Sequence, residues 1–304
     1  MPPNTDPPAF DFENLTAVVA LRQHGAFPAG TLTLASLELY REAWIAILWI
    51  EFDAFGDDFP HWVFNVTDDL GNNYIGRNRA GIGGGLPGGR SQHRAVVMFM
   101  PGLDPAAQTL TFELRAVQGT IGFTEGVGHF YTVKNVVGGP WTVDIPLQAA
   151  PQATNVELFS DDSPCPTFHA DDVWKVVPVA QRQIANDYAL TLYSLEFCRS
   201  GWIAVIRADY PYQHGPLPDR RRWEVIDDQG RDYRGFDEGG SGGGIIGQRM
   251  TWRMDYRFRP ALGPDASRLK LMIDYIGSRP PPNPDGLHGT VVGPWTFEIE
   301  LDAT

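Results

Sequence analysis

The sequence predicts an all-β protein made of two tandem β-sandwiches. Three observations support this: apolar residues alternate with polar ones, glycine and proline are abundant, and the second half of the chain repeats the first. Of the 304 residues, 33 are glycine and 25 are proline, which supplies the tight turns that short antiparallel strands require. At roughly 150 residues per domain, the length of the chain also favours two domains.

The repeat is clearest in two stretches that lie 158 residues apart. Residues 33–47 read TLASLELYREAWIAI and residues 191–205 read TLYSLEFCRSGWIAV, so nine of fifteen positions are identical. Other matches follow in the same order: Asp68-Asp69-Leu70-Gly71 with Asp227-Asp228-Gln229-Gly230, Gly83-Gly84-Gly85 with Gly242-Gly243-Gly244, and Gly139-Pro140-Trp141 with Gly293-Pro294-Trp295. Matches kept in one order indicate the duplication of a unit of about 130 residues, which is domain-sized and too long for a solenoid repeat.

The hydrophobic pattern inside each copy is that of strands. In residues 141–147 and 295–301 every second residue is apolar, which fits one buried face of a pleated strand and no helix. The residues around Trp44 and Trp202 are almost continuously apolar, as expected of a central strand covered on both faces or of a hairpin core. The Asp-Asp-x-Gly motifs lie between strand-like runs and are typical of hairpin turns. We therefore expect about seven or eight short strands per copy.

The limits of the repeat define the expected domains. Residues 1–15 form an N-terminal segment, 16–147 the first sandwich, 148–172 a connector and 173–301 the second sandwich. The connector contains prolines and five acidic residues but neither lysine nor arginine. Few contacts cross segments of this composition, so we expect it to separate two domains that fold independently.

The order of motifs resembles a known group of domains. Each copy has a W-I-A strand, a D-D-x-G-x-x-Y hairpin, a glycine-rich loop, an F-x-P turn and a final G-P-W-x-x-x-I-x-L strand. This order is similar to poorly characterised bacterial immunoglobulin-like domains, including those in the extracellular parts of some anti-sigma-factor proteins. The resemblance covers both copies and implies two tandem immunoglobulin-like β-sandwich domains from an internal duplication. It implies no catalytic residues.

Charge and apolar content limit the classes of partner and the location. The formal net charge of −13 argues against bulk binding to nucleic acid or anionic lipid, because both favour a positive surface. The first residues lack the basic and apolar regions of a secretory signal, and the longest apolar stretch, residues 43–50, is far shorter than the ~20 residues that span a bilayer. We therefore expect an acidic, soluble protein of the cytoplasm. Cys165 and Cys198 are then free thiols, or they form a single disulfide.

Motifs of catalysis and cofactor binding are missing from the sequence. There is no G-x-S-x-G, H-E-x-x-H or C-x-x-C pattern, and the seven histidines are scattered, so we expect neither an enzyme nor a bound metal or cofactor. Both glycine-rich loops match G-x-G-x-x-G, at 83–88 and 242–247, but strands are expected on both sides where a dinucleotide site needs a helix. Cys198 falls in a strand pattern, which favours a buried small hydrophobe.

Apolar residues in the glycine-rich loops are the first candidates for contact with a partner. Ile82 and Leu86 lie in the loop of the first copy, and Ile245 and Ile246 lie in that of the second. Apolar side chains on a loop can anchor another protein, although a long connection between sheets explains these loops as well.

Arginines on one strand are the second candidates. In residues 251–259 the apolar residues alternate, which places Arg253, Arg257 and Arg259 together on the opposite face. These arginines face water, meet a partner, or pair with the carboxylates of the acidic connector. Exposed ion pairs of that kind contribute only about 0–1 kcal/mol each.

We expect a non-enzymatic interaction or assembly module whose loops and sheet edges meet another protein or a second copy of the chain. The alternative is a ligand-binding protein that uses its loops. The carboxylates available for calcium are Asp53, Asp57 and Asp58, followed by Asp68 and Asp69 in the next turn, although solvated loop charge is the simpler interpretation.

The same alternative includes a carbohydrate ligand. Trp62, Tyr210 and Tyr212 would then present their rings to sugars. Packing in a core explains Trp62 equally well.

Overall fold

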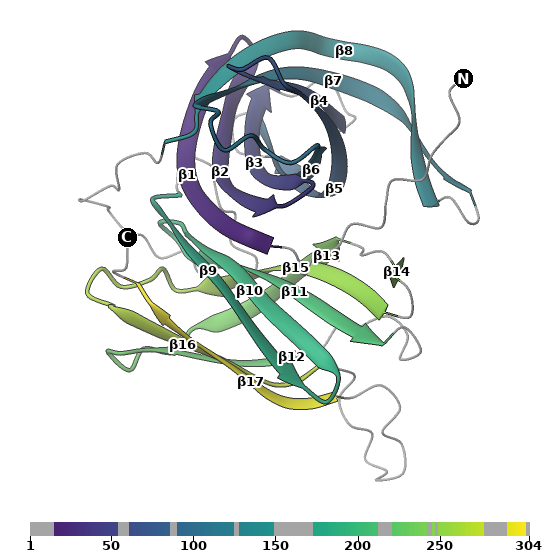
Figure 1. Ribbon diagram of the computed structural model, residues 1–304. Coiled ribbons are helices and arrows are strands. Elements are labelled where there is room, and N and C mark those ends of the chain that lie inside the picture. Colours follow the sequence, from purple (N-terminus) through teal and green to yellow (C-terminus); the bar gives the residue numbers. More distant parts are fainter. Residues whose placement is uncertain are drawn as a thin grey trace. The chain divides into compact units, whose positions relative to one another are not determined.

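The computed structural model describes residues 15–53, 61–85, 90–124, 128–148, 173–211, 221–241, 245–246, 249–276 and 291–301. Every regular element within these ranges is a β-strand, so the all-β prediction is confirmed (Figure 1). None of the described elements is a helix that could cross a membrane. The chain divides into two compact units, formed mainly by Val19–Thr154 and Val177–Thr304, which we call the N-terminal and the C-terminal unit.

The strands of the N-terminal unit form one antiparallel sheet. In chain order they are β1 (Leu15–Phe27), β2 (Gly30–Tyr40), β3 (Trp44–Asp53), β4 (His61–Asp68), β5 (Asn73–Gly85), β6 (Arg90–Met100), β7 (Thr109–Thr124) and β8 (Gly128–Pro146). Their order in this eight-stranded sheet is β1-β2-β3-β6-β5-β4-β7-β8. Figure 1 shows the sheet curling round, so that one face of each strand points into a common core.

Aromatic residues fill the core of the N-terminal unit. Trp44 stacks on Phe99 with ring centroids 4.3 Å apart and meets Tyr74 edge-on at 5.4 Å. Trp62 meets Phe52 edge-on at 5.0 Å. These pairs join β3, β4, β5 and β6, so the alternation read from the sequence becomes a single core.

The strands of the C-terminal unit form two sheets. In chain order they are β9 (Lys175–Ala185), β10 (Tyr188–Phe197), β11 (Trp202–Pro211), β12 (Arg221–Asp227), β13 (Arg234–Ser241), β14 (Ile245–Ile246), β15 (Arg249–Arg259), β16 (Arg268–Ile276) and β17 (Val291–Glu300). The larger sheet has the order β13-β15-β11-β10-β9, with β14 also paired to β15, and the smaller has the order β12-β16-β17.

The two units pair their second, third and sixth strands, counted in N-terminal order, in an equivalent register. Trp44 in β3 lies opposite Phe99 in β6, and Trp202 in β11 lies opposite Phe258 in β15. An irregularity interrupts β2 and β10 at matching places, between 34 and 36 and between 192 and 194. The units differ at the hairpin that follows β4 or β12. In the N-terminal unit β4 and β5 pair through three residues, which joins all eight strands into one sheet. In the C-terminal unit β12 and the chain before β13 share a single bridge, Ile226 with Asp232, and the strands form two sheets.

Strands β3 and β11 are buried on both faces. Trp44, Ala46 and Leu48 belong to the core, and Ile45 and Ile47, which alternate with them, are buried as well. Of the two interpretations of these apolar runs, the central strand is therefore correct, because β3 is paired on both edges, by β2 and by β6.

Candidate functional site

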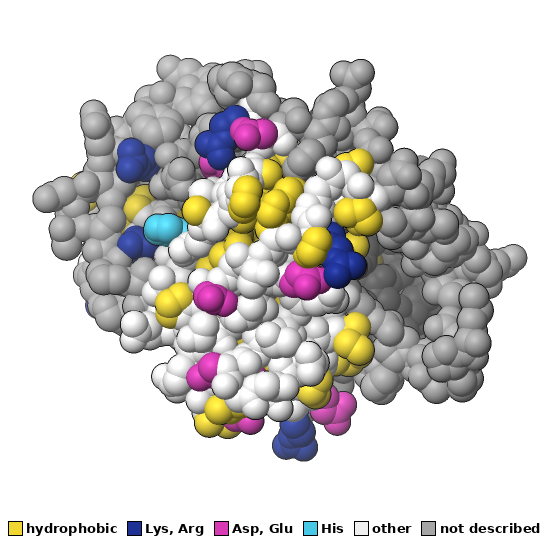
Figure 2. Space-filling model, turned by 90° about the horizontal axis from the view of Figure 1, so that it is seen from above, with side chains coloured by type: hydrophobic (Ala, Val, Ile, Leu, Met, Phe, Trp, Pro, Cys, Tyr) yellow, Lys and Arg dark blue, Asp and Glu magenta, His cyan; other side chains and the backbone are white. Residues whose placement is uncertain are grey.

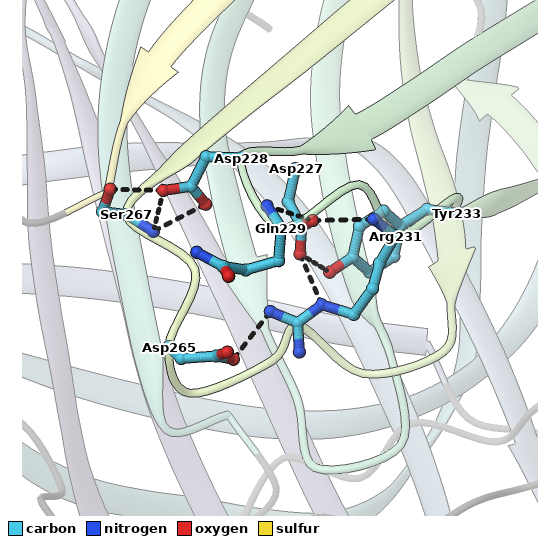
Figure 3. Close-up of polar contacts among 7 residues, drawn as sticks. All are labelled: Asp227, Asp228, Gln229, Arg231, Tyr233, Asp265 and Ser267. Carbon is cyan, nitrogen blue, oxygen red and sulfur yellow. Dashed lines mark hydrogen bonds and ion pairs between the residues drawn. The ribbon is translucent and has the colours of Figure 1, made fainter.

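The Asp-Asp-x-Gly motif of the C-terminal unit forms a turn around a buried carboxylate (Figure 3). Asp227 ends β12, and its Oδ1 accepts hydrogen bonds from the main-chain N–H groups of Gln229, at 3.0 Å, and Arg231, at 2.9 Å. Its Oδ2 accepts the hydroxyl of Tyr233, at 2.8 Å, and Nε of Arg231, at 2.7 Å. Gly230 supplies the positive φ, +79°, that closes the turn. The expected hairpin turn is thus organised by its first aspartate.

The second aspartate of the motif ties this turn to another loop. Asp228 accepts hydrogen bonds from the main-chain N–H of Ser267, at 3.1 Å, and from its hydroxyl, at 2.6 Å. Arg231 reaches the same loop, where its Nη2 lies 2.7 Å from Oδ1 of Asp265 (Figure 3). This loop leads into β16, so the motif fixes the β12 turn to the start of the neighbouring strand.

The N-terminal unit repeats the arrangement with different partners. Asp68 accepts the main-chain N–H groups of Leu70 and Asn72, at 3.0 and 2.8 Å, and the hydroxyl of Tyr74, at 2.7 Å. The side-chain amide of Asn72 takes the place of the arginine and donates to Oδ2 at 2.8 Å. Asp69 accepts from the main-chain N–H of Gln108 at 2.9 Å. The turn therefore has the same hydrogen-bond geometry in both units.

Hydrogen bonding keeps both buried carboxylates ionised. Burial raises the pKa of Asp68, but the hydrogen bonds from Tyr74, Asn72 and Leu70 outweigh it and hold the pKa below the ordinary 3.8. The pKa of Asp227 is lowered in the same way, against its burial, by bonds from Arg231 and Tyr233. Burial and the bond to Asp68 raise the pKa of Tyr74 to about 12. At neutral pH each pair is therefore a phenol that donates to a carboxylate.

These contacts bear on the calcium hypothesis. Both carboxylate oxygens of Asp68 accept hydrogen bonds from residues of the turn or just after it, so this side chain has a structural role. Within the described part of the chain, no group of three or more potential ligands is placed to hold a metal ion. Asp53 is exposed at the end of β3, and Asp57 and Asp58 lie outside the described residues.

The face of β10, β11 and β15 that points away from the core carries a buried polar cluster. Arg207 donates from Nη2 to Oδ1 of Asp209, at 2.5 Å, and from Nη1 to the hydroxyl of Tyr193, at 3.3 Å. Thr251 also donates to Asp209, at 2.9 Å, and the guanidinium of Arg253 lies over the ring of Tyr193, 5.5 Å from its centroid. Sequence reasoning missed this cluster. The available signal was a charged pair, Arg207 and Asp209, inside an otherwise apolar strand.

The three arginine candidates differ in how deeply they are buried. Arg253 and Asp255 are buried, with 8% and 7% of their surface exposed, whereas Arg257 and Arg259 are partly exposed. As predicted from alternation, Met254 and Phe258 lie on the opposite, core side. Nearly all of the acidic connector lies outside the described residues, so its pairing with the arginines stays a prediction.

Three of the four apolar candidates from the glycine-rich stretches lie in strands and not in loops as expected. Ile82 falls in β5, opposite Arg94 of β6. Ile245 and Ile246 form β14, which pairs with Met250 and Arg249 at the start of β15. Leu86 lies outside the described residues. Their contact with a partner stays a prediction.

Two of the aromatic residues considered for a carbohydrate are core residues. Trp62 is 1% exposed and Tyr210 is fully buried, stacked on Tyr188 with ring centroids 5.3 Å apart. The expected exposure of Tyr210 is therefore wrong, whereas for Trp62 the alternative of core packing is confirmed, because alternation turns both side chains inward. Tyr212 lies outside the described residues, as does Cys165. Cys198 is fully buried, which confirms its interpretation as a small buried residue of the strand region.

Apolar side chains are exposed at the β4–β5 hairpin of the N-terminal unit. Ile75 is 70% exposed, Leu70 in the turn is 52% exposed and Val63 is 37% exposed. Ile75 lies opposite Asn65, so Val63, two residues earlier in β4, is its diagonal neighbour on the same face. We call these three residues the hairpin face. Figure 2 shows hydrophobic side chains reaching the surface among charged ones on one side of the molecule.

The C-terminal unit carries polar residues at the matching positions. Gln229 corresponds to Leu70, Arg234 to Ile75 and Arg222 to Val63. Sequence reasoning did not single out the hairpin face. The signal that identifies it is this exchange of polar for apolar residues between two copies that otherwise keep their motifs.

Comparison with known proteins finds little similarity. The chain matches no protein-family model and no curated protein. A crystal structure described as the conserved domain protein from Bacillus anthracis is similar over 93% of this chain and 91% of that one, with 12% identity and a TM-score of 0.37.

Proposed function

We propose that the chain is a duplicated pair of immunoglobulin-like sandwiches that acts as a protein-interaction or assembly module. The strand order supports the fold. Without β1, the N-terminal unit pairs its strands as β2-β3-β6-β5 and β4-β7-β8. This order is the same as that of the ABED and CFG sheets of a constant-type immunoglobulin domain when β2 is taken as strand A, β5 as strand D and β8 as strand G, which supports the proposed fold.

The C-terminal unit supports the duplication. Its strands pair as β10-β11-β15-β13 and β12-β16-β17, which is the same order with β9 as the additional first strand. Both units also hold a buried aspartate and a tyrosine in the turn between strands C and D. A shared strand order, shared register and shared turn chemistry favour one ancestral domain over two unrelated sandwiches.

The hairpin face is the observation that supports an interaction. Ile75 and Leu70 expose more than half of their surface although they are large and apolar. The fold does not require apolar residues there, because the matching positions of the C-terminal unit are Arg234 and Gln229. Exposed apolar residues that the fold does not need indicate contact with another protein. The proposal is therefore that the module acts by binding and not by catalysis.

The test replaces the hairpin face with the residues that the second copy already uses. The variant Leu70→Gln with Ile75→Arg is expected to keep its melting temperature and to lose a stoichiometric partner that the wild-type chain retains from native lysate. Ile184→Arg, at a residue of β9 that is 68% exposed, is the matched control and is expected to retain the partner. Equal capture by all three proteins would reject the hairpin face as the contact.

A further inference from the structure

Strand β5 has an edge that no described strand covers. On one side, β5 pairs with β6 from Ile75 to Gly85. On the other side, β4 pairs only with Asn73, Tyr74 and Ile75. From Gly76 onward the outer main-chain N–H and C=O groups of β5 therefore have no strand partner among the described residues. An open edge of this kind is a template for another strand.

Strand β13 has an equivalent open edge in the C-terminal unit. It pairs with β15 from Arg234, opposite Arg259, to Ser241, opposite Arg253. It is the last strand of its sheet, so within the described residues its other edge pairs with no strand. In the proposed sandwiches, β5 and β13 are both strand D, so the open edge occurs at the same place in the two units.

The first strands of the two units are protected in a way that β5 and β13 are not. In β1 and β9 a residue with positive φ, Arg22 at 49° and Ala180 at 51°, interrupts the extended chain. Just beyond it, the side-chain amides of Gln23 and Gln181 donate to the carbonyls of Gln148 and Glu298, at 2.7 and 2.8 Å. The edge of β1 is thus fastened to the chain just after β8, and the edge of β9 is fastened to β17.

The sequences of the two open edges are complementary in charge. Strand β5 reads NYIGRNRAGIGGG and contains two arginines, Arg77 and Arg79. Strand β13 reads RGFDEGGS and contains two adjacent acids, Asp237 and Glu238. Two β5 edges repel one another and so do the acidic parts of two β13 edges, whereas the mixed pair attracts.

We propose that β5 of one copy of this chain pairs with β13 of a second copy, edge to edge. The occupant of each open edge is thus another molecule of the same protein. Main-chain hydrogen bonds supply the contact, and the arginine–acid complementarity selects the mixed pair over the two like pairs. Because the contact joins different surfaces, it continues into larger assemblies or closes into a ring. This inference rests on the proposed assembly function and names its partner.

The test is a charge exchange followed by sedimentation velocity at low and high salt. The wild-type chain is expected to associate at low ionic strength, with an association constant at least about tenfold lower in 0.5 M salt, because screening weakens exposed charge pairs. Arg77→Glu with Arg79→Glu, and Asp237→Arg with Glu238→Arg, are each expected to be monomeric. An equimolar mixture of these two variants is expected to associate again, since one acidic β5 then meets one basic β13.

The control changes the net charge by the same amount elsewhere. Glu224→Arg with Glu298→Arg alters two exposed acids on the outer face of β12 and β17 and is expected to associate as the wild type does. A wild-type chain that is monomeric at low salt, or a mixture that stays monomeric, overturns the proposal. Neither result affects the hairpin face, because capture of a partner is measured separately with the Leu70→Gln, Ile75→Arg double variant and its Ile184→Arg control.

Discussion

The hydroxyl of Tyr233 donates a hydrogen bond to Oδ2 of Asp227 at 2.8 Å, and Tyr74 donates to Asp68 in the same way at 2.7 Å. In each unit the aspartate lies just before the turn and the tyrosine lies just after it. Their hydrogen bond therefore links the two ends of the turn. The carboxylate also accepts two main-chain N–H groups of its own turn, which holds the turn in shape. The turn is therefore part of the stability of each unit.

Replacing the buried aspartate should destabilise its own unit. Asp227→Ala leaves the N–H groups of Gln229 and Arg231 and the hydroxyl of Tyr233 without their acceptor, and the expected loss is about 2–4 kcal/mol. Tyr233→Phe removes one donor and should cost about 0.5–1.5 kcal/mol. Urea unfolding of the C-terminal unit measures both values. Glu224→Ala, at an exposed position of β12 in the same unit, is the control, and an Asp227→Ala loss no larger than the control value would remove the turn from the stability argument.

The protonation of His93 should make the N-terminal unit less stable as the pH falls below neutrality. Burial, with a smaller effect of His61, lowers the pKa of His93 from 6.5 to about 4. The unfolded chain therefore binds this proton first, and stability is lost as the pH falls from about 6.5 to about 4, by up to about 3 kcal/mol. His93→Gln should flatten the free energy of unfolding in this pH window, and His24→Gln should not. An unchanged slope in His93→Gln would assign the pH dependence to other groups.

The tryptophan that joins β3 to β6 should be among the most costly residues to remove. Trp44 is fully buried and stacks on Phe99, so Trp44→Ala leaves a large cavity and should cost about 3–5 kcal/mol. Trp202 stacks on Phe258 at 4.1 Å and should behave alike. Thermal unfolding followed by circular dichroism tests both, with Leu70→Ala as an exposed control. A nearly unchanged melting temperature would contradict the core position of these strands.

The two units should fold separately. Fragments 16–147 and 173–301 each contain complete sheets, and proteolysis of the intact chain should cut between 148 and 172. Far-ultraviolet circular dichroism and cooperative melting of each fragment check this expectation. Fragments that are unfolded on their own would show that the units depend on one another.

Calcium should not stabilise the N-terminal unit. The oxygens of Asp68 are already used by its turn, so millimolar calcium is expected to leave the melting temperature unchanged. A rise that Asp57→Ala abolishes would restore the loop-based ligand hypothesis. Calorimetric titration of the wild-type chain is the confirming measurement.

The sequence by itself determined the class of the fold. Side chains alternate across a strand with a period of two, so the pattern of residues 141–147 is visible without any knowledge of what the strand packs against. A second local rule predicted the turns at Asp68 and Asp227, because the aspartates and the glycine of the Asp-Asp-x-Gly motif favour the backbone conformations of a tight turn. The internal repeat was equally accessible, since comparing the chain with itself needs no coordinates.

Only the tertiary structure decided what individual polar and aromatic residues do. Asp68 became a buried acceptor and not a calcium ligand because Tyr74 and Asn72 come back to it. Trp62 became a core residue and Arg253 a buried one through contacts with residues far away in the chain, which a local pattern does not contain. The exposure of Ile75 is also decided by the tertiary structure. Its neighbours β4 and β6 pair with its main chain, and no described element covers its side chain, which is 70% exposed.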